Sequence, residues 1–442
     1  MFRRKIYRQL QQWKDTRAGK TALLLEGQRR VGKSTVVEEF ARNSYKSYII
    51  IDFSTCSGEI CNLFNDLSDL DYFFLQLQLL TNVHLEKRNS VIIFDEVQLF
   101  PLARQAIKSL VRDHRYDYIE TGSLISIKKN VKDILIPSEE QRLYMYPMDF
   151  EEFLWAIGDT MTVPMLELLF NKQKPTGDGA HRQIMRKLRL YMLIGGMPQA
   201  VATYLQENNF EDVDRVKRDI LQLYEDDFYK IDPAGRLSQL FDAIPAQLNR
   251  NTARYTVSSV IPTMRPSNSL HLITQLLDSR TVLTAYHISQ PSAEMASYKD
   301  LNRFKLFLSD TGLFTTLMFK NKSFTDNDIY RKLLSDKLSA NLGYLFENLV
   351  AQMLCTNGYE LYYHTFTSKE KSSAYEIDFL LTHGNKVTPI EVKSSNYLRH
   401  SSLDAFAEKY SAQIDNKYVL STKDFRQEKD IHLLPIYMTP FI

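Results

Sequence analysis

Residues 21–40 read TALLLEGQRRVGKSTVVEEF, and this stretch decides the fold of the first part of the chain. The apolar run from Thr21 to Leu25 is typical of a buried strand, and Gly27 to Ser34 match the pattern GxxxxGKS/T. Apolar residues then recur at helical spacing up to Phe40. A strand, a glycine-containing loop and a helix in this order predict a phosphate-binding loop, whereas an ordinary glycine turn with a surface lysine needs neither flanking element.

The chemistry of such a loop depends on its residue types. Glycines let backbone N–H groups surround phosphate oxygens, and the helix N-terminus adds its dipole. Lys33 is expected to reach the β- and γ-phosphates, and Ser34 to ligate Mg²⁺. ATP and Mg²⁺ are therefore the predicted substrate and cofactor.

A second apolar run, Val91 to Phe94, ends in Asp95 and Glu96. Alone, this pair would be interpreted as a solvated strand end. Beside the phosphate-binding loop it predicts a Walker B element, with Asp95 next to Mg²⁺ and Glu96 polarising an attacking water.

A third strand ends in Thr121-Gly122-Ser123, where a γ-phosphate sensor or a simple turn would use the same small hydroxyl residues. The predicted nucleotide-binding residues are Gly27, Gln28, Arg29, Arg30, Val31, Gly32, Lys33, Ser34, Thr35 and Thr121.

Length and composition bound the remaining possibilities. A chain of 442 residues predicts about three domains. Its 55 Lys and Arg against 53 Asp and Glu leave a formal charge of +2, so DNA contacts would need local basic patches. Three cysteines without CxxC spacing favour the reducing cytoplasm over a disulfide framework or zinc site. Neither a signal peptide nor a membrane span is expected.

The pattern along the chain predicts an α/β protein of several parts. Strands alternating with helices up to residue 150 favour a parallel sheet. Residues 151–230 look helical and are a candidate lid, and Thr281 to His287 could form the wing of a small helix-turn-helix unit. From residue 342 a helix and three strands predict a second α/β unit. No internal repeat is found.

Several motifs together resemble one family, the bacterial and archaeal AAA+ type ATPases that share a C-terminal domain of unknown function. The loop resembles G-P-R-Q-V-G-K-T, with Gln28, Arg30 and Ser34 as departures. The segments that carry the rest of the resemblance are Asp95–Gln98, Thr121–Ser123, Gln141–Arg142, Pro147–Phe153, Gly195–Pro198 and Leu306–Leu313.

The resemblance implies a P-loop AAA+ domain over 1–155 and a helical lid over 156–235. It further implies a winged-helix-like segment over 236–320 and a restriction-endonuclease-like α/β domain over 321–442. A ring or nucleotide-driven homo-oligomer is compatible with it.

Carboxylates in the last α/β unit suggest a second site. Asp378, followed on the next strand by Glu391-Val392-Lys393, resembles the PD-(D/E)xK nuclease motif. Alternate strand residues share a face, so Glu391 and Lys393 point the same way. With Glu347 from the preceding helix, Asp378 and Glu391 would bind Mg²⁺ or Mn²⁺. A charged pair on a solvated strand face is the alternative interpretation.

These observations lead to one leading hypothesis for the function and to alternatives. The first is an ATPase in which Lys33, Asp95 and Glu96 act on ATP and the nucleotide state controls a metal-dependent nuclease-like module acting on DNA. The catalytic residues of that module would be Asp378, Glu391 and Lys393. The main alternative is a nucleotide-dependent switch or scaffold with a catalytically silent nuclease-like fold. A further alternative is a DNA-binding regulator that uses the winged helix, with duplex affinity that depends on salt.

Overall fold

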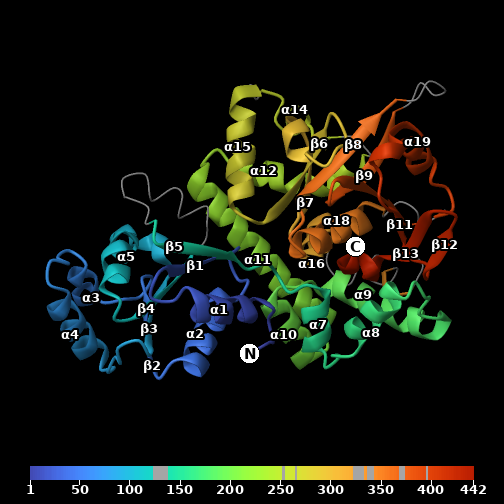
Figure 1. Cartoon of the computed structure of the whole chain (residues 1–442). Coiled ribbons are helices and arrows are strands. Elements are labelled where there is room, and N and C mark those ends of the chain that lie inside the picture. Colours follow the sequence, from blue (N-terminus) through green and yellow to red (C-terminus); the bar gives the residue numbers. More distant parts are fainter. Residues whose placement is uncertain are drawn as a thin grey trace. The chain divides into compact units, whose positions relative to one another are not determined.

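The computed structural model describes residues 1–122, 138–250, 254–263, 266–321, 333–335, 343–367, 374–394 and 397–442 (Figure 1). The chain divides into two units. The first comprises residues 1–146 with 278–280, and the second comprises residues 147–277 with 281–442.

The described part of the first unit forms one five-stranded sheet in the order β2-β3-β4-β1-β5. Its strands are β1 (Ala22–Glu26), β2 (Ser47–Asp52), β3 (Ser90–Asp95), β4 (Asp117–Gly122) and β5 (Glu140–Tyr144). Every neighbouring pair is parallel, as the sequence predicts. Because parallel strands end at the same edge, the segments that follow β1, β3 and β4 lie together there.

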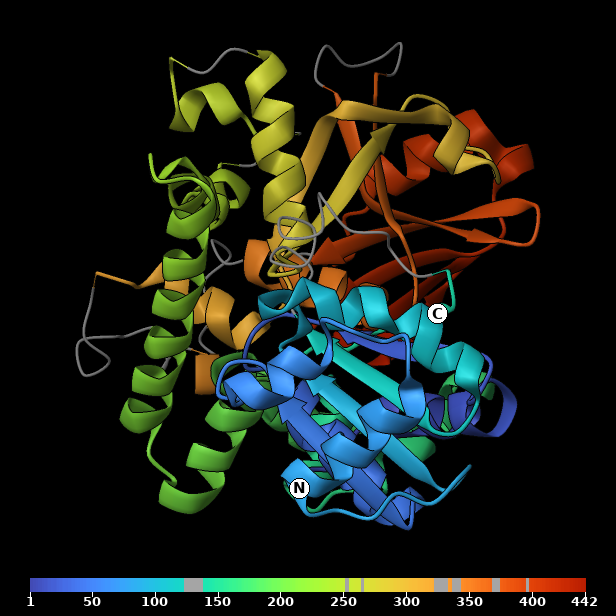
Figure 2. The same cartoon turned by 90° about the vertical axis from the view of Figure 1, so that its left-hand side faces the viewer.

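Helices cover both faces of this sheet (Figures 1 and 2). They are α1 (Ile6–Thr16), α2 (Lys33–Ser44), α3 (Gly58–Leu63), α4 (Leu70–Thr81) and α5 (Pro101–Asp113), with a 3₁₀ turn η1 (Val97–Leu99). Successive residues of β1 point to opposite faces, so Leu23 packs with α1 and α2 whereas Leu24 packs with α4 and α5. All five β1 residues are buried, which explains why the strand has no polar side chain before Glu26.

The second unit begins with a run of helices that covers the segment expected to be helical, residues 151–230, and continues to residue 278. These are α7 (Phe150–Ala156), α8 (Thr162–Asn171), α9 (Asp178–Ile194), α10 (Pro198–Glu207), α11 (Phe210–Ile231), α12 (Arg236–Asp242), α13 (Ile244–Asn249), α14 (Val257–Val260) and α15 (Pro266–Asp278). Helix α7 starts with a capping box, in which Asp149 accepts from the Glu152 N–H and Glu152 accepts from the Asp149 N–H.

An eight-stranded sheet follows, in the order β12-β13-β11-β10-β9-β8-β6-β7. Its strands are β6 (Val282–Ile288), β7 (Lys299–Leu308), β8 (Leu361–Phe366), β9 (Tyr375–His383), β10 (Lys386–Lys393), β11 (Lys417–Ser421), β12 (Arg426–Glu428) and β13 (Ile431–Pro435). The accompanying helices and turns are η2 (Met295–Tyr298), α16 (Thr311–Met318), α18 (Gly343–Thr356), α19 (Ser401–Tyr410), η5 (Ser411–Gln413) and η6 (Ile436–Phe441).

The hairpin of β6 and β7 differs from the expected wing of a winged helix. β6 pairs antiparallel with β7 and parallel with β8, so the hairpin forms the edge of the large sheet. Strands from both sides of the boundary expected at residue 320 therefore belong to one sheet. The physical reason is that β6 is largely buried, and its backbone groups need a partner strand on each side.

The last α/β part has the order α18-β8-β9-β10-α19-β11. β8, β9 and β10 form an antiparallel meander, and β10 pairs parallel with β11. The helix and the three strands predicted from residue 342 onward thus lie where the sequence indicates. Among the described residues, no helix combines the length and apolar character required to cross a bilayer.

Candidate active site

The loop between β1 and α2 has the backbone that phosphate binding requires. Gly32 adopts a φ of 95°, in the left-handed region that favours glycine. A Cβ on Gly27 would lie 2.6 Å from the Met145 carbonyl oxygen, so no side chain fits there. Both glycines of the motif are therefore required, Gly32 by its backbone conformation and Gly27 by the lack of space for a side chain.

Lys33 is the buried cation of this loop. Its Nζ donates to the carbonyl oxygens of Gly27 (3.0 Å) and Gln28 (3.1 Å), and only 7% of the residue is exposed. Burial lowers the pKa of Lys33, while the nearby Glu96 and Asp95 act in the opposite direction. An ammonium held by neutral carbonyls in a glycine cradle fits a phosphate anion.

Asp95 collects two hydroxyl groups at the end of β3. Its Oδ1 accepts from Ser34 Oγ at 2.9 Å and also from Thr121 Oγ1. The predicted Mg²⁺ ligands Ser34 and Asp95 thus lie together, and Thr121 contacts the carboxylate from β4. Ser123 lies outside the described residues.

Glu96 has an unusual backbone. Its φ of 54° and ψ of 42° place it in the left-handed region, and it precedes the η1 turn. The Gln98 side chain donates from Nε2 to Glu96 Oε2. Sequence reasoning assigned no role to Gln98, although it stands in the quoted Asp95–Gln98 motif.

The N-terminal segment stabilises the phosphate-binding loop through hydrogen bonds from Arg4. Arg4 donates from Nη1 to the Val31 carbonyl (3.1 Å) and from Nη2 to the Tyr146 carbonyl (2.6 Å). Arg4 and Val31 are buried. The other predicted nucleotide-binding side chains, Arg29, Arg30 and Thr35, are exposed.

The C-terminal carboxylates also come close together, but with a lysine that the sequence did not indicate. Lys305 of β7 is buried, and its Nζ lies 2.8 Å from Glu347 Oε1 and 2.6 Å from Glu376 Oε1. Asp378 Oδ2 accepts from the Val392 N–H at 2.7 Å. Carboxylates 42 and 71 residues away along the chain thus share one ammonium.

Glu391 and Lys393 pair with each other, at 2.5 Å between Oε1 and Nζ. Burial raises the pKa of Glu391, and burial together with Glu347 raises that of Asp378 well above its usual range. Burial alone would lower the pKa of Lys305, but Glu347, Glu376 and Asp378 raise it well above its ordinary value.

Within the described ranges, no three His, Cys, Asp or Glu side chains form a group that could hold a metal ion. The predicted ligand set of Glu347, Asp378 and Glu391 stays a prediction; in the structure Lys305 pairs with Glu347, and Lys393 pairs with Glu391.

Three further segments of the family resemblance meet at a structural contact. The Met148 N–H donates to the Gly196 carbonyl (2.7 Å), and the Gly196 N–H donates to Asp310 Oδ2 (2.6 Å). Asp310 Oδ1 also caps α16 through the Leu313 N–H. A Cβ on Gly196 would lie 2.0 Å from the Met148 carbonyl oxygen. These backbone groups and the Asp310 carboxylate hold the segments before α7, α10 and α16 together.

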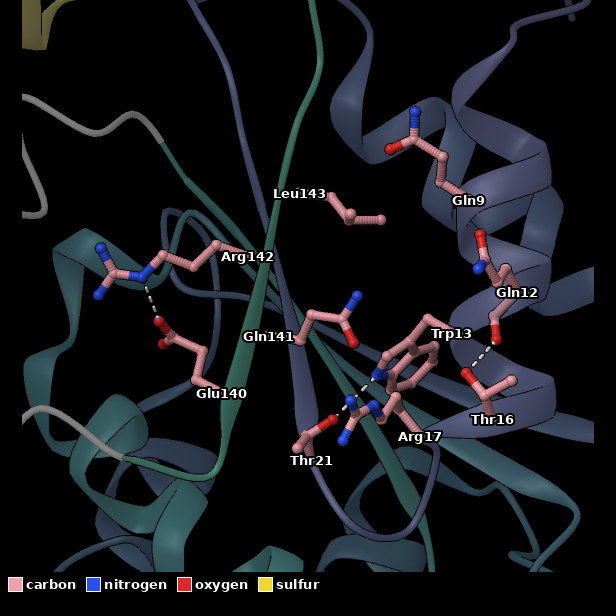
Figure 3. Close-up of a pocket in the computed structure, with 10 residues that line it drawn as sticks. All are labelled: Gln9, Gln12, Trp13, Thr16, Arg17, Thr21, Glu140, Gln141, Arg142 and Leu143. Carbon is pink, nitrogen blue, oxygen red and sulfur yellow. Dashed lines mark hydrogen bonds and ion pairs between the residues drawn. The ribbon is translucent and has the colours of Figure 1, made fainter. Parts of the chain in front are cut away.

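A separate pocket of about 770 Å³ lies between α1 and β5 (Figure 3). Its lining includes Trp13, Arg17 and Thr21, and Trp13 Nε1 donates to Thr21 Oγ1 at 3.3 Å. Thr21 precedes β1 whereas Gly27 follows it, so this pocket is at the opposite end of the strand from the phosphate-binding loop. Arg142 faces away from α1 and pairs with Glu140 at 2.8 Å.

Comparison with known proteins assigns three segments. Residues 19–154 match an AAA domain, and residues 185–323 and 342–439 each match a domain of unknown function. No curated protein matches the chain.

Three solved structures are similar in part. The Walker-type ATPase of Pyrococcus abyssi is 15% identical, with 72% of this chain and 96% of that chain covered and a TM-score of 0.43. PCH-2 of C. elegans is 14% identical, with 46% and 60% covered and a TM-score of 0.24. The RuvB Holliday junction branch migration motor of Thermotoga maritima is 12% identical, with 64% and 89% covered and a TM-score of 0.26.

The match over residues 19–154 agrees with the parallel sheet, the glycine loop and the Asp95 carboxylate described above. The first unit of this chain therefore carries a P-loop ATPase domain of the AAA type.

Proposed function

We propose that the first unit binds ATP with Mg²⁺ and hydrolyses it, and that the nucleotide state controls the second unit. The observation that carries this proposal is the Asp95 carboxylate, which holds the hydroxyls of Ser34 and Thr121 at the strand edge where Lys33 lies. A nucleotide-binding loop, a Mg²⁺ ligand pair and an adjacent carboxylate are the parts that phosphoryl transfer needs.

Each residue has a defined task in this proposal. The loop N–H groups and Lys33 hold the phosphates, and Ser34 and Asp95 would hold Mg²⁺. When bound, the ion neutralises charge on the phosphate oxygens. Glu96 accepts a proton from water as the water oxygen attacks the γ-phosphorus. The bond to the bridging oxygen breaks, leaving ADP and phosphate.

Replacement of the base tests this assignment. Glu96→Gln should lower phosphate release by about 10²- to 10⁴-fold and leave the binding of a fluorescent ATP analogue intact. Glu59→Gln, an exposed carboxylate on α3, is the matched control and should hydrolyse ATP normally. Normal turnover by Glu96→Gln, or no turnover by the wild type, contradicts the proposal.

For the second unit, we propose the switch rather than the nuclease. The element order α18-β8-β9-β10-α19-β11, and the Glu391 Oε2 atom, buried without a hydrogen bond from the described residues, favour a nuclease-like metal site. Against this, Lys305 already supplies the positive charge that Glu347 and Glu376 would otherwise take from a metal ion. The second observation carries more weight, because one buried ammonium accounts for both partly buried carboxylates.

A cleavage assay separates the two functions. Single-stranded, linear and supercoiled DNA are incubated with Mg²⁺ or Mn²⁺, with and without ATP, using the wild type and Lys393→Ala. A silent fold leaves every substrate intact. Cleavage that disappears in Lys393→Ala would establish the nuclease and overturn the switch.

A further inference from the structure

Gln98 contacts the residue on which the proposed hydrolysis depends. It belongs to the η1 turn, only 6% of it is exposed, and its Nε2 donates to Glu96 Oε2. In the described part of the chain, this is the one hydrogen bond that the Glu96 carboxylate accepts. Oε1 is thereby left for water.

The Glu96 carboxylate needs a hydrogen-bond partner to fix its position, because the backbone restrains only the Cα atom. The left-handed conformation of Glu96 ends the extended course of β3, and the bond from the Leu99 N–H to the Glu96 carbonyl (2.9 Å) closes the 3₁₀ turn that follows. Beyond Cα, however, a glutamate rotates about three bonds. A freely rotating carboxylate would spend most of its time away from the attacking water.

Lys33 is the competing partner. Among the charges that favour its ammonium form, Glu96 ranks first and Asp95 second. Nevertheless Lys33 Nζ contacts the carbonyls of Gly27 and Gln28, and no ion pair joins it to Glu96 in the described residues. An ion pair between these two side chains would remove the phosphate ligand and the base at once.

We propose that Gln98 is a positioning residue that holds the Glu96 carboxylate away from Lys33 and aimed at the attacking water. The inference rests on the proposed ATP hydrolysis. A neutral amide suits this task because it donates a hydrogen bond without adding a charge that would attract or repel phosphate.

The test is a double-mutant cycle on the full chain. Gln98→Leu should lower kcat by about 10- to 100-fold and change KM for ATP by less than about threefold, since the loop contacts remain. In a Glu96→Gln background, measured under single-turnover conditions, Gln98→Leu should cause no further loss. Gln98→Met, which also lacks the donor, serves if the leucine variant fails to fold.

Gln78→Leu is the matched control. Gln78 is a partly buried amide of α4 that bonds the Phe74 carbonyl and the Leu85 N–H, and its loss should leave kcat unchanged. Equal losses in kcat and ATP affinity, or a full further loss in the Glu96→Gln background, would overturn the inference. If Glu96→Gln itself hydrolyses ATP normally, the proposed function fails instead, so the two failures are distinguishable.

Discussion

Lys33 in the first unit and Lys305 in the second are both buried, but their surroundings differ. Lys33 Nζ donates to two neutral carbonyls, and burial lowers its pKa. Lys305 Nζ contacts two carboxylates, which raise its pKa against the effect of burial. The first arrangement has positive charge to offer an incoming anion. In the second, the ammonium is already paired with two carboxylates, so similar residue types form a proposed anion-binding site in one place and a structural ion network in the other.

The largest effect is expected at Lys33. Lys33→Ala should reduce ATP hydrolysis by at least about 100-fold, because the loop loses the cation that contacts the phosphates. Phosphate release measures this loss. Lys46→Ala is the control, since Lys46 is exposed and pairs with Glu86, away from the loop. Normal ATP hydrolysis by Lys33→Ala would contradict a phosphate-binding role for Lys33 and hence its difference from Lys305.

Removal of the second lysine should affect stability instead. Lys305→Met should lower the free energy of unfolding by about 2–4 kcal/mol, because the partly buried carboxylates of Glu347 and Glu376 lose their shared counter-charge. Urea unfolding measures the loss, and Mn²⁺ should restore part of it by replacing the ammonium.

Lys320 provides the comparison for that experiment. It pairs with Glu225 and Asp242 but is 37% exposed on its side chain. Lys320→Met should therefore cost no more than about 1 kcal/mol. Equal losses for Lys305→Met and Lys320→Met would show that burial of the Lys305 network contributes nothing.

A third buried lysine, Lys217, extends the comparison of buried lysines to the pH dependence of stability. Lys217 donates to the Leu193 carbonyl (2.6 Å), and burial lowers its pKa to about 8. Between pH 8 and 10.5 the native protein loses this proton before the unfolded chain does. Wild-type stability should therefore rise relative to Lys217→Met by up to about 3 kcal/mol as pH increases through this range. Urea midpoints at pH 7.5 and 10 test this, and a constant difference between the two proteins would contradict it.

The smallest effect is expected at Asp378. Burial and Glu347 raise its pKa well above the usual range, which favours the neutral carboxyl over the carboxylate. Asp378→Asn keeps an oxygen that can accept from the Val392 N–H and should change stability by less than about 1 kcal/mol. Glu347→Gln, which breaks a charged pair, should cost more. A larger loss in Asp378→Asn, measured by urea unfolding, would indicate an ionised carboxylate.

The candidate phosphate-binding site was largely predictable because its parts lie at the carboxyl ends of parallel strands of one sheet. Lys33, Ser34, Asp95 and Glu96 lie after β1 and β3, and parallel strands bring their ends together. Gln98 was part of a quoted motif but received no role. Only the left-handed turn at Glu96 brings the Gln98 amide into hydrogen-bond contact with the Glu96 carboxylate. No spacing rule predicts that contact.

The second site was less predictable because its decisive residue comes from elsewhere in the chain. Lys305 belongs to β7, which joins the sheet through β6, and neither strand contains a motif for carboxylate binding. The pattern around Asp378 and Glu391 gave the strands and their order. It could not give the counter-charge, because long-range strand pairing is not encoded in local periodicity.

The Arg4 contact has a consequence for how the ATPase domain can be isolated. The family match begins at residue 19, after α1, yet Arg4 bonds the carbonyls of Val31 and Tyr146, and Leu10 and Trp13 pack under α2. A recombinant fragment trimmed to residues 19–154 would expose that apolar surface and leave the loop unsupported. Expression of this domain should therefore keep Arg4 and α1, with no purification tag placed directly before Arg4.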